Sequence, residues 1–574
     1  MPITAQEPEV KLETMRIGAF SGGINTSAPA SKIRDDEMVA CRNFEFDQEG
    51  DLVTRNGVIG AQGVIGVWDQ TLWDQSLWDS LGTTYSSRIT SILDFEGASA
   101  FVGIIYTVGT QLISRTLDGV ITSLTGALTL PDSVRWYWKI FNGVAIGVNG
   151  LTSGDNPIKV VSPAPGTASK LTTAPPGKFI EVWGNRLWIA RSDQPNQLQA
   201  SDIGLHDSWN TDAGANPSHG AQWDLDKDDG DRITGLYATK ERLFVFKKKK
   251  IIVGEENPDH PNDLRYVRFT IYSSTVGCIA ASTIQPVLDD VLFLAEGGVA
   301  SLSAAQIVAD FESALVSTKH ADIQKIRRDL AQEDVCSIII SDRSQYCLSV
   351  SRNASATSEN ISYIFDYRDL KKGQVRWVDF DGLAFGTSWE VYDHDVQNLV
   401  YLVGCHDTVN NVFFIGKYIP RAINKTFIDS SLAIRKILLT KVYDFDLQEL
   451  RKYLSKWYTK LFLLTNDVSL TVSYFLDEST QPTGTYTFNL VAELGGVSFD
   501  DPLIKFDDAG AIFDEGVEAV IERIKKSFLY GEDKPRKAVT VQFSFLSNQT
   551  NQGFGIQEFA IKHQSLSDYR SNTI

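Results

Sequence analysis

Short apolar runs, each followed by a polar or glycine turn and a second apolar run, recur along much of the chain. The clearest pairs cover residues 183–190, 233–246, 290–302, 337–350, 362–380 and 399–418. Paired short strands around a tight turn are typical of antiparallel sheets. Successive pairs begin 25 to 57 residues apart, an irregular spacing around the roughly 40 to 50 residues of a propeller blade. The pattern predicts an irregular β-propeller, with a stacked sandwich as the alternative because no WD40 or kelch signature accompanies the repeat.

Two stretches have helical rather than strand spacing. Residues Ala321 to Gln332 and Glu515 to Phe528 place apolar side chains three and four positions apart. Both stretches are predicted to be amphipathic packing helices inserted between groups of strands.

After about residue 435 the pattern changes to longer strands with alternating apolar positions. In the run from Val539 to Phe545, the side chains of Val539, Val541, Phe543 and Phe545 share one face because side chains alternate across a strand. The chain is therefore predicted to be all-β with a few inserted helices, an irregular β-propeller followed by a C-terminal β-sandwich. The expected domains are an N-terminal arm bracing the propeller (residues 1–60), a propeller-like body (61–435) and the sandwich (436–574).

The composition agrees with a folded protein of two or more domains. The chain has 574 residues, of which 43% are hydrophobic and 22% charged, a balance that can bury sizeable cores. Its first residues lack the basic start and apolar stretch of a secretory signal, and no apolar run approaches the roughly 18 residues of a membrane span. We predict that the protein is made in a cytosol and does not insert into a membrane.

The five cysteines are predicted to be reduced packing residues. They lie far apart in the sequence, without a C-x-x-C pair, at Cys41, Cys278, Cys336, Cys347 and Cys405. Cys336 and Cys347 are close enough to face each other across a hairpin, but a cytosolic origin argues against a disulfide.

Net charge and motif content argue against tight nucleic-acid binding and against catalysis. The chain carries 54 basic and 72 acidic residues, a net charge of −18, whereas a tight DNA binder must neutralise phosphates. The seven histidines show no H-E-x-x-H spacing, and G-x-S-x-G and P-loop patterns are absent. No catalytic, cofactor-binding or metal-binding residue is predicted, and no cofactor. The remaining enzymatic alternative is a carbohydrate-cleaving propeller whose two carboxylates come from distant blades.

The acidic stretch from Asp224 to Asp231 invites comparison with a calcium loop. It departs from the EF-hand template because Asp229 stands at the glycine position and Gly235 at the closing glutamate. A solvated loop leading into the strand at Ile233 is the preferred interpretation, and a loose cation site is the alternative.

Two further segments are candidate contact sites. Trp68, Trp73 and Trp78 repeat every five residues, so one face of a strand cannot hold all three. We predict that they contact another subunit or a neighbouring protein of an assembly, the alternative being a loop folded back on its own propeller.

The second candidate contact is a run of four lysines between two apolar strand halves. It comprises Lys247, Lys248, Lys249 and Lys250. An exposed turn or charged edge is the simplest interpretation. The sharper hypothesis is contact with phosphate at the constriction of a channel.

The N-terminal residues carry the most specific pattern of the chain. They read Phe20-Ser-Gly-Gly-Ile-Asn-Thr-Ser-Ala-Pro29, Ile33-Arg-Asp-Asp-Glu37, Arg42-Asn-Phe44 and Gly50-Asp-Leu-Val-Thr-Arg-Asn-Gly57. This text resembles the opening of tail nozzle, tail tubular and packaged-DNA stabilisation proteins of short-tailed, podovirus-like bacteriophages, in which it introduces a β-propeller. The resemblance extends over most of residues 16–400, including 185–190, Ser201-Asp202 with Trp209, 242–247 and 293–299.

The resemblance implies a structural virion protein rather than an enzyme. It implies a ring, expected to be a hexamer, around the DNA exit channel, where it retains the genome and conducts it during ejection. The expected partners are adaptor and portal-side tail proteins, tail fibres or spikes, and viral DNA passing without tight binding. Such a protein is assembled in the host bacterial cytoplasm and ends in the virion tail. The alternative is a host-recognition or baseplate-hub protein that binds a cell-surface glycan or receptor. Trp136-Tyr137-Trp138 could then stack on sugars, although these residues suit a blade core equally well.

Overall fold

Strands and their connecting loops make up most of the computed structural model. The model describes residues 13–565 except for 48, 61–83, 97–101, 117–120, 133, 163, 213–215, 261–262, 308–313, 327–334, 351–360, 382–384, 394–397, 408–411, 421–426, 430–431, 446–450, 466, 492–522 and 530–535. The chain forms two units. The propeller unit comprises residues 58–423 and 429–431, and the sandwich unit comprises residues 1–57, 424–428 and 432–574.

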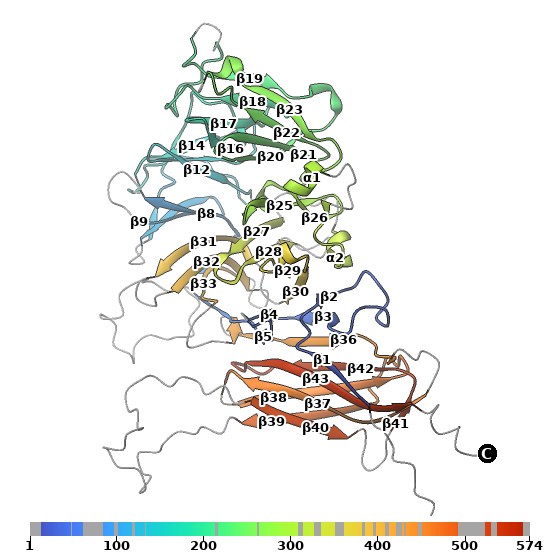
Figure 1. The fold of residues 1–574 in the computed structure, drawn as a ribbon. Helices are drawn as coiled ribbons and strands as arrows, with labels where there is room; N and C mark the ends of the chain where they lie inside the picture. Colours follow the sequence, from blue (N-terminus) through green and yellow to red (C-terminus); the bar gives the residue numbers. More distant parts are fainter. Residues whose placement is uncertain are drawn as a thin grey trace, which may run out of the picture. The chain divides into compact units, whose positions relative to one another are not determined.

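The described residues of the propeller unit form seven antiparallel blades, and Figure 1 labels many of their strands. Blade 1 contains β8 (Ile89–Glu96), β9 (Val102–Val108), β10 (Gln111–Thr116) and β11 (Ile121–Ser123). Blade 2 contains β12 (Tyr137–Phe141), β13 (Val144–Val148), β14 (Ile158–Val160) and β15 (Ser169–Lys170). Blade 3 contains β16 (Gly177–Trp183), β17 (Arg186–Arg191), β18 (Gln197–Ala200) and β19 (Ala221–Asp224). Blade 4 contains β20 (Ile233–Ala238), β21 (Arg242–Lys247), β22 (Ile251–Glu255) and β23 (Arg268–Ser273). Blade 5 contains β24 (Gln285–Val287), β25 (Asp290–Ala295) and β26 (Gly298–Ser301). Blade 6 contains β27 (Val335–Ile340), β28 (Gln345–Val350), β29 (Ile361–Asp366) and β30 (Arg376–Asp381). Blade 7 contains β31 (Phe385–Asp393), β32 (Asn398–Asp407) and β33 (Val412–Tyr418), together with β6 (Val58–Gly60) and β7 (Thr84–Tyr85).

The blades close into a ring. The first strand of one blade packs against the first strand of the next. Between blades 4 and 5 the short 3₁₀ segment η3 (Ala281–Thr283) takes part, because it contacts β20 as well as strands of blades 5 and 6. The ring closes where β31 of blade 7 packs against β8 of blade 1. The last blade also takes in chain from before the first blade, because β6 pairs with β33 through Gly60 and Gly416. The fold is a β-propeller, as the strand period predicted, and not a stacked sandwich.

The burial of both faces of each blade explains the sequence pattern. Separate apolar clusters lie between blades 1 and 2, 2 and 3, 3 and 4, 4 and 5, 5 and 6, and 7 and 1. A strand covered on both faces reads as a continuous apolar run rather than as an alternating one. All six predicted strand pairs are confirmed as neighbouring strands of a blade. The pairs at 337–350 and 362–380 belong to the same blade, blade 6, so the prediction of one blade period between successive pairs is wrong there.

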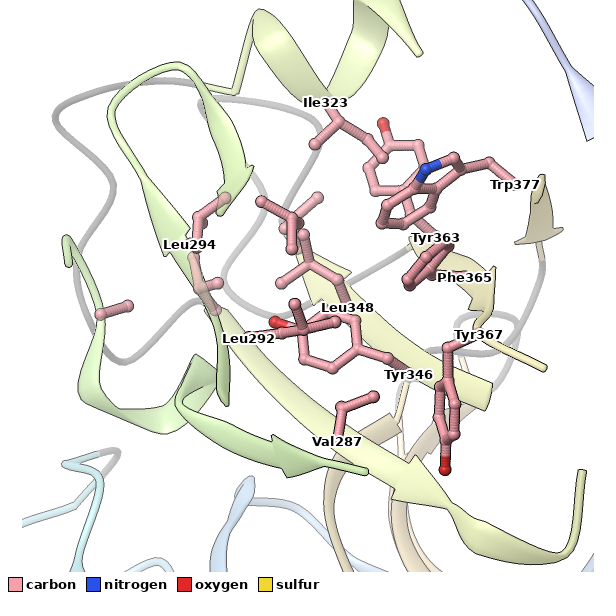
Figure 2. Close-up of a cluster of buried hydrophobic side chains, with 14 of the residues drawn as sticks. Val287, Leu292, Leu294, Ile323, Tyr346, Leu348, Tyr363, Phe365, Tyr367 and Trp377 are labelled. Carbon is pink, nitrogen blue, oxygen red and sulfur yellow. The ribbon is translucent and has the colours of Figure 1, made fainter. Parts of the chain in front are cut away.

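One of these cores, between blades 5 and 6, is drawn in Figure 2. Leu292 and Leu294 of β25 face Leu348 of β28, while the rings of Phe365 and Trp377 stack with centroids 5.0 Å apart. The indole N–H of Trp377 donates to the carbonyl oxygen of Val316 at 3.2 Å, so this large side chain is satisfied at its polar atom.

Turn residues with left-handed backbones fix the hairpins inside the blades. Between β16 and β17, Gly184 and Asn185 both have positive φ, at 57° and 53°. Two such residues in succession form the type of turn whose twist suits a two-residue hairpin. The Gly-Asn pair therefore sets the register in which Trp183 faces Arg186.

All five cysteines are buried and free, as predicted. In the register of β27 and β28, Cys336 faces Ser349 and Cys347 faces Ile338, so the two thiols are not opposite each other. Burial raises the pKa of the Cys278 thiol to about 12.

We expect native protein to react with Ellman's reagent at less than one thiol per chain within minutes, and at all five thiols after unfolding in guanidinium. The reason is that a buried thiol is neither ionised nor accessible. Rapid reaction of a thiol without denaturant would contradict the buried positions.

The sandwich unit contains two facing groups of strands. The first is β1 (Glu13–Gly18), β4 (Phe44–Phe46), β5 (Leu52–Thr54), β37 (Lys452–Leu463), β40 (Arg523–Leu529), β41 (Arg536–Ala538) and β43 (Phe554–Ser565). The second is β2 (Gly23–Ile24), β3 (Glu37–Arg42), β36 (Lys436–Thr440), β38 (Asp467–Leu476), β39 (Gly484–Val491) and β42 (Val541–Ser547). Two short strands are β34 (Ile428–Asp429) and β35 (Leu432–Ala433).

The predicted alternation in the last part of the chain is confirmed. Val541, Phe543 and Phe545 of β42 are fully buried, while Val539 lies just before the strand. The ring of Phe559 from β43 contacts the rings of Phe543 and Phe545 at centroid distances of 4.9 and 5.6 Å. These contacts join the two groups of strands into a sandwich core.

The N-terminal segment differs from the predicted arm. Residues 1–57 belong to the sandwich unit, where β1 and β5 pair with β43, and β3 pairs with β36. The sandwich is therefore built from both ends of the chain, because the N-terminal strands complete the sheets that the C-terminal strands begin.

The helix predictions are correct in one place and wrong in another. The described helices are α1 (Leu302–Ile307) and α2 (Ala321–Gln324), and the further 3₁₀ segments are η1 (Lys227–Asp229), η2 (Leu264–Tyr266), η6 (Ser341–Arg343) and η7 (Leu370–Lys372). Helix α2 begins where predicted and buries Ile323, but it ends at Gln324, well before the predicted Gln332, and residues 327–332 lie outside the described part of the chain. The helix over 515–528 is wrong for residues 523–528, which lie in β40 and pair with β37. Ile524 and Phe528 are four positions apart, a spacing that puts them on one face in a helix and in a strand alike, and the long neighbouring strand decides between the two.

Candidate functional site

The predicted contact residues fall into two groups. Trp68, Trp73 and Trp78 lie outside the described residues, so their contact with a subunit or tail neighbour stays a prediction. The lysines lie at the turn between β21 and β22, which the N–H of Lys247 closes by donating to the carbonyl oxygen of Lys250 at 2.9 Å. We call residues 247–250 the lysine turn.

The ammonium group of Lys247 is buried and held on several sides. Its Nζ donates to both carboxylate oxygens of Asp229, at 3.0 and 2.9 Å, and to the carbonyl oxygens of Asp226 and Asp231, at 3.0 and 3.2 Å. The Lys247 side chain has 0% exposure. This geometry is that of a bound cation, with the cation supplied by the chain itself.

The other lysines of the turn are also tied to the acidic loop between β19 and β20. Lys250 Nζ lies 2.8 Å from Oδ2 of Asp229 and 3.0 Å from Oδ2 of Asp226. The backbone N–H groups of Lys248 and Lys249 donate to the two carboxylate oxygens of Asp231, at 3.2 and 2.9 Å. The acidic loop therefore holds both the side chains and the backbone of the lysine turn.

The lysines and aspartates of this cluster stabilise each other's charged forms. Burial alone would raise the pKa of Asp229, but hydrogen bonds from Lys250 and Lys247 outweigh it and lower this pKa to about 2. Hydrogen bonds to Asp229 and Asp226 raise the pKa of Lys250. Both partners therefore stay ionised at neutral pH, and the ion pairs persist.

The lysine turn also contacts the beginning of blade 5. The N–H of Cys278 donates to the carbonyl oxygen of Lys247 at 2.9 Å, and a Cβ on Gly277 would lie 2.3 Å from that same oxygen. Lys248 Nζ lies 3.7 Å from Oε1 of Glu296 in the turn between β25 and β26. The turn thus fastens the loop that enters blade 4 to blade 4 itself and to blade 5.

These contacts correct the interpretation of both charged segments. The acidic stretch and the lysines were predicted as two independent exposed features, whereas the structure joins them and buries Lys247. Lys247 and Lys250 cannot neutralise phosphate while they hold these carboxylates. The DNA-channel prediction remains for Lys249 and for Lys248, whose carboxylate partner Glu296 lies farther away, at 3.7 Å. The sequence signal was available: opposite charges meet across one strand–turn unit, with Asp229 and Lys247 only 18 residues apart.

A metal ion has little room in this cluster. The position that a cation would take between Asp226, Asp229 and Asp231 holds the Lys247 ammonium. Across the described residues, no group of three or more histidine, cysteine, aspartate or glutamate side chains is placed to hold a metal ion.

A second polar cluster involves residues that carry the family resemblance. Arg186, the first residue of β17, is 1% exposed. Its guanidinium donates to the carbonyl oxygens of Ser201, Ser218 and His219 from Nη1 at 2.9, 3.1 and 3.0 Å, and to that of Pro217 from Nη2 at 2.9 Å. Burial lowers the pKa of Arg186, with nearby carboxylates such as Asp202 acting against this. The Arg186 side chain therefore forms hydrogen bonds to both ends of the long loop 201–220.

Asp202 holds the same loop from within. Its carboxylate accepts hydrogen bonds from the Ser208 hydroxyl at 2.8 Å, from the side-chain amide of Asn210 at 2.6 Å and from the N–H of Gly220 at 2.7 Å. Burial would raise the pKa of Asp202, but these hydrogen bonds lower it. We call Arg186 and Asp202 the loop clamp, and sequence reasoning did not single out this role.

The centre of the propeller contains a cavity of about 410 Å³. Side chains from the first strands of blades 1, 2, 6 and 7 and from the start of blade 5 line it, including Ser91, Arg135, Gln285 and Glu390. Among the described residues that line it, Glu390 is the one carboxylate, whereas glycoside hydrolysis needs two. The described lining of the cavity therefore gives no support to the carbohydrate-cleaving alternative.

The tryptophans proposed as a sugar platform belong to a blade core. Trp136 and Trp138 are buried and stack with ring centroids 5.7 Å apart. The indole N–H of Trp138 donates to the Ser91 hydroxyl at 3.0 Å. Their ring faces are therefore occupied by packing within the protein.

Comparisons with known proteins assign no family. No protein-family model and no curated protein matches the chain. Among solved structures, it is similar to Hsv2 of Kluyveromyces lactis, with 12% identity and a TM-score of 0.27 over 59% of this chain and 97% of Hsv2. It is also similar to a catalytically inactive virginiamycin B lyase from Staphylococcus aureus with quinupristin, with 11% identity and a TM-score of 0.29 over 60% of this chain and 97% of the lyase. Likenesses this distant assign neither ligand nor activity to the chain.

In the described part of the chain, no helix is long and apolar enough to cross a membrane.

Proposed function

We propose that the protein is a structural component of a bacteriophage tail that forms a ring around the DNA exit channel. The observation that carries this proposal is that polar residues of the nozzle-like sequence pattern hold loops and blades of the propeller together. Arg186 and Asp202 hold a long loop, and Lys247 fastens neighbouring blades, so these conspicuous polar residues serve the rigidity of the scaffold. Rigidity of this kind suits a part that bears the pressure of a packaged genome.

The size of the central cavity supports a conduit made from several copies. Side chains from five blades line a space of only about 410 Å³, whereas the major groove of DNA alone is about 12 Å wide. We therefore infer that duplex DNA does not thread a single propeller. A channel for it requires copies arranged around a common axis, and we expect six by the family resemblance.

The charge of the chain fits passage without tight binding. The net charge is −18, and two of the four clustered lysines are engaged by aspartates. Phosphates would meet little fixed positive charge, so DNA would slide rather than adhere. Screening over about 8 to 10 Å means that only groups lining the bore would act on the DNA.

The test is cryo-electron microscopy of purified phage particles that carry this chain. We expect a closed ring on the tail axis with DNA above or inside it. Copies that project from the periphery toward the host would overturn the ring and favour the alternative, a host-recognition protein. Sedimentation of the purified chain should show a species of several copies, and a strictly monomeric protein in the virion would also refute the proposal.

A further inference from the structure

The outer rim of the propeller has a groove between blades 3 and 4. Its volume is about 560 Å³, within the range of small-molecule sites. The end of β19 forms one wall, and β23 with the turn before it forms the other. The residues that define it are Trp223, Asp224, Arg265, Tyr266, Arg268 and Ile271.

The floor of the groove is aromatic and rigid. Trp223 stacks on the fully buried Trp188 with ring centroids 5.1 Å apart and planes inclined by 22°. Phe269 packs its edge against Trp223 at 5.3 Å. At the open side, Tyr266 and Ile271 are 43% and 59% exposed, although both are large apolar side chains. The aromatic core between the two blades therefore continues to the surface.

Polar groups in the groove are left unused, in contrast to the lysine turn and the loop clamp. Among the described residues, the indole N–H of Trp223, the hydroxyl of Tyr266 and the guanidinium of Arg268 make no hydrogen bond or ion pair. Asp224 accepts a hydrogen bond from the side-chain amide of Gln197 through Oδ1 at 3.0 Å, which leaves Oδ2 available to a ligand. Arg265 is different, because Asp263 already holds it.

We propose that this groove binds a carbohydrate. A sugar ring presents apolar C–H faces, which suit an aromatic floor, and hydroxyl groups that both donate and accept hydrogen bonds. Arg268 and the Trp223 indole supply donors, and Asp224 supplies an acceptor. This inference does not depend on the ring proposed above.

Other occupants fit the groove less well. Nucleic-acid phosphates would face the carboxylates of Asp224 and Asp226, on a chain with a net charge of −18. An apolar segment of a second copy would cover Ile271 but leave the free donors of Trp223 and Arg268 unpaired, which is costly in a buried contact. Sugar hydroxyls satisfy both donors and the free acceptor.

The test is binding of purified full-length protein to a panel of oligosaccharides containing neutral hexoses, N-acetylhexosamines and uronic acids, together with smooth lipopolysaccharide. Calorimetry and tryptophan fluorescence are the readouts. We expect at least one member to bind, and Arg268→Ala and Tyr266→Ala each to weaken that binding roughly tenfold or more, since each removes a direct hydrogen-bonding group. Both side chains are exposed, and the His260 ring on which Tyr266 stacks, with centroids 4.0 Å apart, is exposed as well, so thermal melting should change little.

Arg232→Ala is the matched control, because Arg232 is an exposed arginine of the same unit that does not line the groove. It should bind the sugar as the unchanged protein does. Failure of every panel member to bind, or binding that survives both groove substitutions, would overturn the proposal. So would a change of oligomeric state on Tyr266→Ala, which would make the groove a protein contact instead.

Discussion

Replacing Arg186 with methionine is expected to lower the local opening free energy of the loop 201–220 by about 3 kcal/mol. Arg186 donates four hydrogen bonds to carbonyl oxygens at both ends of this loop. Methionine fills a similar volume but donates none, so several inward-facing carbonyls lose their partner. Hydrogen-exchange mass spectrometry should show exchange in this loop faster by roughly a hundredfold.

Arg191→Met provides the control for this experiment. Arg191 ends the same strand, β17, but its partner Asp193 and its own side chain are partly exposed, at 32% and 21%. Exposed pairs of this kind contribute about 0–1 kcal/mol. Unchanged exchange in loop 201–220 of Arg186→Met, or an equal effect of both substitutions, would show that Arg186 does not clamp the loop.

The parts of the fold that the sequence predicted are those with local signals. A blade hairpin lies within about 15 residues, and its two-sided burial produces the continuous apolar run that marks it, as in β13 and β25. The alternation of Val541, Phe543 and Phe545 likewise reflects one buried face. Both patterns depend only on neighbours along the chain.

The N-terminal strands illustrate what local patterns cannot predict. Thr14 pairs with Lys562, and Val53 pairs with Gly555, across more than 500 residues. Nothing in the composition of either segment specifies a partner so distant, because any strand with a suitable face can pair. The same limit applies to β40, whose pairing with β37 decides between two periodicities that its sequence permits.

The charged clusters were visible in the sequence, but their burial was not. A run of lysines and a run of aspartates look alike whether they are solvated or paired in the interior. The pairing depends on the positions of the loop between β19 and β20 and of the turn between β21 and β22, which the blade fold brings together. The rim groove escaped prediction for a related reason, since Trp223 and Arg268 come from different blades.

Replacing Lys247 with methionine is expected to reduce the stability of the propeller unit by about 2–4 kcal/mol, because removal of one partner leaves a poorly compensated buried carboxylate. The substitution keeps the length of the side chain and removes the charge that Asp229 and two carbonyl oxygens surround. Thermal and urea unfolding measure the loss. Lys249→Met is the control, since Lys249 is exposed and makes only a backbone hydrogen bond to Asp231, so its effect should lie within about 0.5 kcal/mol.

Acid provides an independent test of the same cluster. The pKa of Asp229 is about 2 in the folded protein, below its usual value of about 3.9 in an unfolded chain. A depressed carboxyl pKa stabilises the fold fully above the unfolded value, and this contribution disappears as the pH falls from about 4 toward 2. Lys247→Met should move the pKa of Asp229 upward, so the variant should lose less stability than the unchanged protein between pH 5 and pH 3. If both proteins lose the same amount over this range, the ammonium of Lys247 is not what holds Asp229 ionised, and the lysine turn would be a packing feature rather than an electrostatic fastener between blades.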